Sequence, residues 1–182
     1  MEALCFYYER IALPTNSRNS GKLRVTMAAY YTSQGYDAPA SVIWSVLTDF
    51  STWPRWFPNV TEIRIENADA PARGTQLLAI GDDSGVWTRW EIAEWTAPVL
   101  FVCEHIESNA PMSGQVQAAY LQFELTAEAE GCMLEVEIGA EGHGVMGDFF
   151  VGMTLGPSAR RMLPRLVDAF SDHVVERVQQ KS

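Results

Sequence analysis

The 182-residue sequence predicts one α+β domain, in which a curved antiparallel sheet of about seven strands wraps around a long C-terminal helix. Three observations support this fold class. Two short helical segments follow the first strand-like segment, a series of turn-bounded strands comes next, and apolar residues recur at helical spacing near the end. Elements in this order are expected to enclose an apolar cavity between the sheet and the last helix.

The first strand and the two short helices fall within residues 23–58. Residues 23–36 are rich in Val, Thr and Tyr, which favours a strand. Pro39 suits the first turn of a helix, and Ile43 and Leu47 lie on its apolar stripe. A second short helix rich in Trp and Phe is then expected, and Pro58 ends it.

The middle of the chain predicts a series of strands joined by short turns. We expect these strands at residues 60–66, 75–80, 87–95, 100–106, 118–127 and 133–140. In the last of them, Leu134 and Val136 alternate with Glu135 and Glu137. Because side chains of a strand alternate between its two faces, one face of the sheet is predicted to be apolar and the other solvated.

The last predicted element is a helix that runs from Ser158 for about 20 residues, or about 30 Å. Pro164 lies inside its pattern and predicts a kink or a late start. Residues 149–156, which precede it, contain apolar side chains between glycines and are interpreted as a loop. This loop either gates the cavity or fills the core.

Composition indicates one folded domain with a short N-terminal extension. Hydrophobic residues make up 47% of the chain and charged residues 20%, as in folded globular proteins. Residues 14–22 form a polar, turn-rich linker. We therefore expect residues 1–24 to be an N-terminal extension and residues 25–180 to form a single ligand-binding domain.

Charge and cysteine content exclude several classes of partner. A net charge of -10 repels phosphate backbones, so we expect no nucleic acid partner. No apolar run is long enough for stable membrane insertion. The three cysteines form no Cys-x-x-Cys pair, and no secretory leader is visible, so a reducing cytoplasm is predicted. The sequence leaves both a monomer and a homodimer open.

No cofactor or metal is expected. Residues 142–147 match Gly-x-Gly-x-x-Gly, but the predicted strand before them belongs to an antiparallel series, whereas a dinucleotide site requires a parallel one. His105, His143 and His173 have no metal-ligand spacing. His173 is expected on the solvated side of the last helix.

Three residues are candidates for acid–base chemistry. His105 faces the cavity if it shares a strand face with Phe101 and Cys103, and a histidine there titrates near neutral pH. Glu104 faces the cavity if the opposite face is buried, and burial would raise its pKa. Alternation alone leaves both orientations open. Tyr120 or a bound water is the expected partner in proton transfer.

Several motifs give the chain a family resemblance. They are residues 37–50, with the pattern Asp-Ala-Pro-Ala-x-x-Ile-Trp-x-x-Leu-x-Asp-Phe, then Trp56-Phe57-Pro58, residues 90–98 and Leu163-Pro164. With the order of elements, they resemble the START-like, helix-grip (SRPBCC) superfamily over about residues 25–178. The most similar branch is the polyketide cyclase/dehydrase and lipid transport group. This resemblance implies that apolar small molecules bind between the sheet and the last helix.

The resemblance also implies by position which residues line that pocket. They come from the second short helix, the inner strand faces, the glycine-rich segment and the last helix, namely Trp53, Trp56, Phe57, Trp90, Ile92, Leu121, Phe123, Phe149, Phe150, Met153, Met162, Leu166 and Phe170.

Three functions follow as hypotheses. The first is binding of a hydrophobic or amphipathic small molecule such as a lipid, an isoprenoid or a polyketide. The second is an enzyme of the cyclase or dehydratase type that needs no metal or nucleotide cofactor. The third is a protein-interaction module related to chaperone-ATPase activators, in which side chains fill the pocket.

Overall fold

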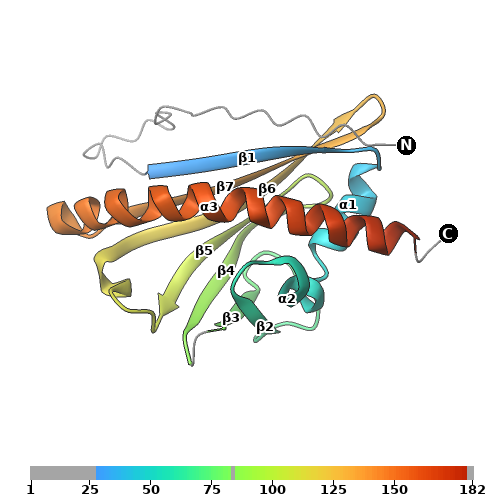
Figure 1. The fold of residues 1–182 in the computed structure, drawn as a ribbon. Coiled ribbons are helices and arrows are strands. Elements are labelled where there is room, and N and C mark those ends of the chain that lie inside the picture. The colour runs from blue at the N-terminus through green and yellow to red at the C-terminus, as the bar shows by residue number, and fades with distance from the viewer. Residues whose placement is uncertain (1–27, 83–84, 180–182) are drawn as a thin grey trace.

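A seven-stranded antiparallel sheet holds a long helix against its concave face (Figure 1). The computed structural model describes residues 28–82 and 85–179. Its strands are β1 (Ala28–Tyr36), β2 (Val60–Ile65), β3 (Gln76–Gly81), β4 (Trp87–Thr96), β5 (Leu100–Ser108), β6 (Val116–Glu128) and β7 (Gly131–Gly142). Its helices are α1 (Ala40–Leu47), α2 (Trp53–Trp56) and α3 (Gly144–Gln179), with 3-10 turns η1 (Phe50–Thr52) and η2 (Ser113–Gln115). The predicted fold class is confirmed.

The strands lie in the order β1-β7-β6-β5-β4-β3-β2, so β1 closes one edge and β2 the other. Alternation sets which face is apolar, as expected. Leu121 and Phe123 of β6 are buried on the concave face, opposite Ile138 and Val136 of β7. The concave face therefore supplies the core, and the convex face carries Gln122 and Glu137, which lie between these residues in the sequence.

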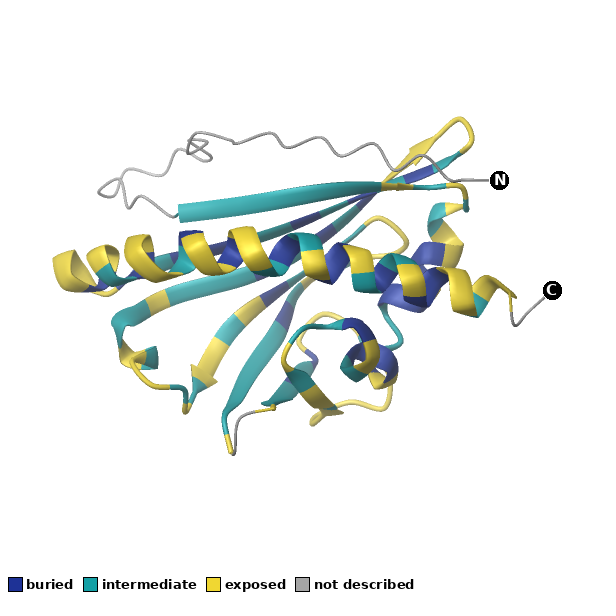
Figure 2. Cartoon of the chain, viewed as in Figure 1, coloured by how far each residue is buried: buried dark blue, intermediate teal, exposed yellow. Residues whose placement is uncertain are grey.

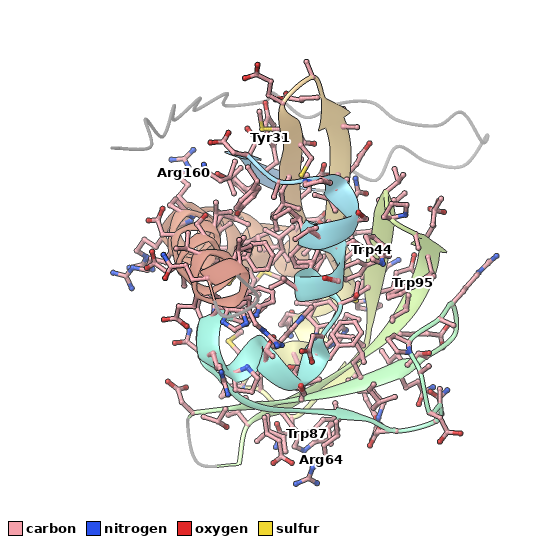
Figure 3. The ribbon with its side chains drawn as sticks, turned by 90° about the vertical axis from the view of Figure 1, so that its right-hand side faces the viewer. Tyr31, Trp44, Arg64, Trp87, Trp95 and Arg160 are labelled. Carbon is pink, nitrogen blue, oxygen red and sulfur yellow. The ribbon has the colours of Figure 1, made fainter. Side chains whose placement is uncertain are left out.

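An aromatic cluster fills the core where α1 and α2 meet the sheet. Phe101 is completely buried at its centre. Its ring contacts those of Trp44, Phe50, Trp53, Trp95 and Phe123. Trp44 of α1 points toward Trp95 of β4, with ring centroids 5.0 Å apart (Figure 3). Edge and tilted contacts of this kind fix the two short helices on the sheet.

The C-terminal half of α3 is packed tightly into the concave face. Leu163, Leu166 and Phe170 are buried there, and the Phe170 ring lies 4.8 Å from that of Trp56 in α2. Figure 2 shows the buried stripe of this half turned toward the sheet. An ion pair between Arg177 and Asp49 ties the end of α3 to the segment before η1. This packing leaves the inner stripe of the helix enclosed.

The start predicted for the last helix was wrong. The helix begins at Gly144, includes the whole of residues 149–156 and continues through Pro157 and Pro164. The glycines of this segment, which suggested a loop, instead allow α3 to pack closely against its neighbours. A Cβ atom on Gly147 would lie 2.6 Å from the carbonyl oxygen of Gln115, and one on Gly156 would lie 2.6 Å from the Tyr30 hydroxyl oxygen. The segment interpreted as a gating loop is therefore part of α3.

The Gly-x-Gly-x-x-Gly pattern is explained by the turn from β7 into α3. Gly144 has a φ of +65°, which glycine adopts without strain. The backbone N–H of His143 donates to the Gln115 carbonyl at 2.8 Å, and that of Gly142 donates to the Asp148 carboxylate at 3.2 Å. The glycines allow this tight turn from strand to helix.

His173 is buried, which corrects its expected place on the solvated side of the helix. Its side chain is 4% exposed, and its Nε2 has no hydrogen-bond partner among residues 28–82 and 85–179. Burial lowers its pKa, as do the nearby Arg177 and Arg55, while Glu176 and Asp49 act weakly in the opposite direction. The neutral imidazole is thus part of the junction between α2 and α3.

Replacing glycine by alanine is expected to have opposite effects on the free energy of unfolding at two positions of α3. Gly147→Ala forces a Cβ against the Gln115 backbone and should reduce the free energy of unfolding by about 1–3 kcal/mol. Gly152→Ala meets nothing within 4 Å, and alanine favours helix, so it should add up to about 1 kcal/mol. Urea unfolding followed by circular dichroism measures both. Equal effects would contradict the packing role of Gly147.

Burial of neutral His173 predicts acid sensitivity. Its pKa is lowered from 6.5 in the folded chain, so the unfolded chain binds more protons as the pH falls. Its contribution to stability is complete above about pH 6.5 and is lost as the pH falls through the folded pKa. His173→Phe should flatten the dependence of the unfolding free energy on pH between about pH 7 and 5. The exposed His143→Gln is the control, and equal slopes in both variants would refute the prediction.

Candidate functional site

A cavity of about 200 Å³ lies between α2 and the concave face of the sheet, near the β2 edge. Residues of α2, of the segment leading to β2, and of β2 to β6 line it. They are Trp53, Phe57, Asn59, Val60, Ile63, Leu77, Ala79, Gly81, Val86, Trp87, Thr88, Trp90, Cys103 and Leu121. None of these described lining residues comes from α3, so the cavity is displaced from the space between the last helix and the sheet, where it was expected.

Trp53 fixes the helical wall of the cavity. Its indole N–H donates to the carbonyl of Leu47 at 2.9 Å, which ties α2 to the end of α1. Its ring stacks on Phe57 at 4.9 Å with an interplanar angle of 5°. The Phe57 backbone N–H in turn donates to the Trp53 carbonyl at 2.7 Å. The two parallel rings therefore form one stacked pair on the helical side of the cavity.

Small residues in β3 create the space. Ala79 pairs with Ile63 of β2 and with Thr88 of β4, and all three line the cavity. Leu77 and Trp90 form the next pair, with much larger side chains. A short side chain at the centre of this face leaves a hollow, since α2 spans the gap to the sheet above it. The cavity is thus set by the size pattern along β3.

Polar groups are few in the lining. Asn59 is exposed at the rim and has a φ of 59°. The Thr88 hydroxyl is hydrogen bonded to that of Ser108 at 3.0 Å. Burial raises the pKa of the Cys103 thiol to about 12, so Cys103 remains protonated at neutral pH and acts as an apolar wall. The cavity therefore offers little polar contact below its rim.

His105 is the candidate acid–base residue that faces the cavity side. Its imidazole lies edge-on to the Trp90 indole, with ring centroids 5.7 Å apart. Burial lowers the pKa of His105, which keeps it neutral at pH 7. His105 itself does not line the cavity, whereas Trp90, which its ring contacts, does.

Glu104 and Tyr120 lie on the opposite face of the sheet. They pair with each other across β5 and β6, between the buried Cys103 and Leu121 of the same two strands. The Tyr120 hydroxyl donates to the Glu137 carboxylate, and burial followed by this contact raises the pKa of Tyr120. The structure therefore does not bring Glu104 or Tyr120 together with His105. Alternation left open whether His105 or Glu104 faces the cavity side, and in the structure it is His105.

The residues expected to line a pocket fall into three groups. Trp53, Phe57, Trp90 and Leu121 line the cavity. Core residues that do not line it are Trp56, Ile92, Phe123, Leu166 and Phe170. On α3, Phe149 and Met153 are exposed, Phe150 and Met162 are half-buried, and all four lie outside the lining.

Sequence reasoning missed the lining residues that have small or polar side chains. Ala79, Gly81, Thr88 and Asn59 were not singled out, and the other lining residues that were not named are Val60, Ile63, Leu77, Val86 and Trp87. A signal existed in β3, where Leu77, Ala79 and Gly81 occupy successive inward positions and decrease in size. Such a gradient on a buried strand face indicates a hollow when a helix covers it.

Metal-binding groups, membrane-spanning helices and free cysteines are three further features that bear on what the described residues can do. Within residues 28–82 and 85–179, no three His, Cys, Asp or Glu side chains are grouped so as to hold a metal ion. None of the helices described in these residues combines the length and apolarity needed to cross a membrane. Cys103 and Cys132 are free thiols, and Cys5 lies outside the described residues.

Comparison with known proteins places this fold. Residues 27–179 match the family model described as polyketide cyclase / dehydrase and lipid transport. A search of curated proteins finds no match. A structure of norcoclaurine synthase from Thalictrum flavum in complex with dopamine and hydroxybenzaldehyde is similar at 14% identity and a TM-score of 0.64, covering 89% of this chain and 97% of that one.

Two further solved structures share the fold. An aromatase/cyclase from a Streptomyces strain has 17% identity and a TM-score of 0.62, with 84% of this chain and 96% of that chain covered. A major latex-like protein from Panax ginseng has 11% identity and a TM-score of 0.64, with 81% and 97% covered. At such identities the structures establish a common fold and not a common activity. Because the family model spans most of the sequence, the chain belongs to the polyketide cyclase/dehydrase and lipid transport family of the START-like superfamily.

Proposed function

We propose that this protein binds a hydrophobic or amphipathic small molecule in the cavity between α2 and the sheet. The observation that carries the proposal is a hollow walled by aromatic and aliphatic side chains, with a few polar groups, chiefly Asn59 at its rim. Sites for small organic ligands have this composition, because burial of apolar surface supplies affinity and a few polar groups set orientation.

The relatives support binding of this kind. The family description joins cyclases and dehydrases to lipid transport, which have in common an apolar ligand held by the protein. The norcoclaurine synthase structure contains dopamine and hydroxybenzaldehyde, which are small aromatic molecules. These likenesses favour an organic ligand over a protein partner.

A cyclase or dehydratase is the second candidate, and His105 favours it. The neutral imidazole lies on the cavity side of β5, beside Trp90, and a neutral imidazole can accept a proton. Such chemistry needs a second polar group near the same ligand atom. Glu104 and Tyr120 lie on the other face of the sheet, so binding is the better supported function.

The interaction-module hypothesis expects side chains to fill the pocket. An open volume of about 200 Å³ between α2 and the sheet argues for a ligand site instead. We therefore propose no protein-interaction role for this cavity.

Filling the cavity should abolish binding. Ala79→Phe places a ring in the cavity, so an apolar ligand can no longer bury its surface against the lining. We therefore expect the dissociation constant of such a ligand to rise at least about tenfold. Isothermal titration calorimetry with 2-naphthol, geraniol and palmitate covers aromatic, isoprenoid and lipid ligands.

Ala127→Phe is the matched control, because Ala127 is also a strand alanine but is exposed on β6. It should bind as the wild type does. Binding that is equally strong in both variants would place the ligand elsewhere, and absence of binding by the folded wild type to all three probes would refute the proposed function.

A further inference from the structure

We propose that the cavity selects a planar compound of one or two rings that is neutral or positively charged, in preference to a fatty acyl chain or an anionic lipid. This inference rests on the proposed function and narrows it to a class of ligand. Four properties of the lining carry it: its volume, its aromatic walls, its lack of charge and the single amide at its rim.

The volume limits the ligand to about two rings. At about 200 Å³, the cavity exceeds the roughly 150 Å³ that accommodates benzene in an apolar protein interior. It is smaller than the roughly 300–1,000 Å³ of pockets that hold drug-sized ligands. A long acyl chain would have to leave much of its length outside, where burial no longer contributes to affinity.

The walls are suited to a flat ligand. Trp53 and Phe57 present their stacked rings from the side of α2, while Trp90 contributes its indole from β4. Aromatic rings gain most from other rings in stacked or edge-on contacts at centroid distances of about 4.5–7 Å. Rings on both layers of the cavity therefore favour a planar aromatic ligand over a flexible aliphatic one.

Charge disfavours anionic ligands. None of the described side chains that line the cavity is charged, so a buried carboxylate or phosphate would find no counter-ion. The chain as a whole carries a net charge of -10, which repels anions further. Tryptophan faces attract organic cations instead. The cavity thus accepts a neutral ring compound or an aromatic amine.

Asn59 provides one point of polar recognition. Its side-chain amide makes no hydrogen bond within the described part of the chain, and it lies at the rim of the cavity. An amide can both donate and accept, so it suits a single hydroxyl or amino substituent on the ring system. The apolar interior would hold the rings while this substituent remains near the mouth.

Calorimetric titration of the whole chain with matched probes tests the ligand class. We expect 2-naphthol to bind at least tenfold more tightly than pyrene, which has four rings, and than palmitate. We expect tryptamine to bind at least fivefold more tightly than indole-3-acetate, which carries the opposite charge on a similar frame. Each affinity should fall at least tenfold in Ala79→Phe and be unchanged in Ala127→Phe.

A second comparison isolates the rim amide. Asn59→Gly keeps the left-handed backbone conformation at this position, since glycine tolerates a φ of 59°, but it removes the amide. It should weaken 2-naphthol binding severalfold and leave naphthalene binding unchanged. Equal losses for both probes would overturn the role given to Asn59.

The outcomes separate this inference from the proposed function. Tighter binding of palmitate or pyrene, lost in Ala79→Phe, would overturn the ligand class and leave the binding function intact. Equal or reversed affinities for tryptamine and indole-3-acetate would overturn the charge preference. If the folded wild type binds none of the probes, palmitate included, both the ligand class and the binding function are refuted.

Discussion

The cavity between α2 and the sheet depends on the contacts by which Trp53 holds α2 in place. The helix has a single turn, which is too short to be stable alone, so its position comes from tertiary contacts. Trp53 supplies them by donating to the Leu47 carbonyl, stacking on Phe57 and packing against Phe123 of β6. These contacts hold one turn of helix above the small residues of β3. The cavity exists because Trp53 holds α2 in place on one side, and because the short side chain of Ala79 on β3 leaves space on the other.

The long helix determines where that cavity can be. Over its C-terminal half, α3 buries Leu163, Leu166 and Phe170 in the concave face, and Phe170 meets Trp56. This packing encloses the middle of the sheet, so the open volume is displaced to the β2–β4 side, where α2 contributes Trp53 to its lining. Thus α3 covers the middle of the concave face, whereas the much shorter α2 forms part of the wall of the cavity.

Sequence patterns predicted the architecture well because burial alternates with periods that differ between strands and helices. The antiparallel order of β2 to β7 followed from the short turns between successive strands. The inward faces of β6 and β7 followed from that alternation. The start of α3 did not, since Gly147 and Gly156 resemble a flexible segment in sequence yet mark close approaches to Gln115 and Tyr30. Trp53, Phe57, Trp90 and Leu121 were predicted to line a pocket, but that pocket was expected between the last helix and the sheet, and the cavity lies beside α2 instead. Which apolar residues form the core and which form a wall depends on the space left after packing, and that is a property of the whole fold.

The most direct test of this account is a crystal structure of the protein grown with 2-naphthol. The account predicts ring density between the Trp53–Phe57 pair and Trp90, with its hydroxyl toward Asn59 and the side chains of α3 unmoved. Density under the N-terminal half of α3, or between α3 and the sheet, would contradict it, because the ligand site would then be the one expected from the family resemblance and not the one formed by α2.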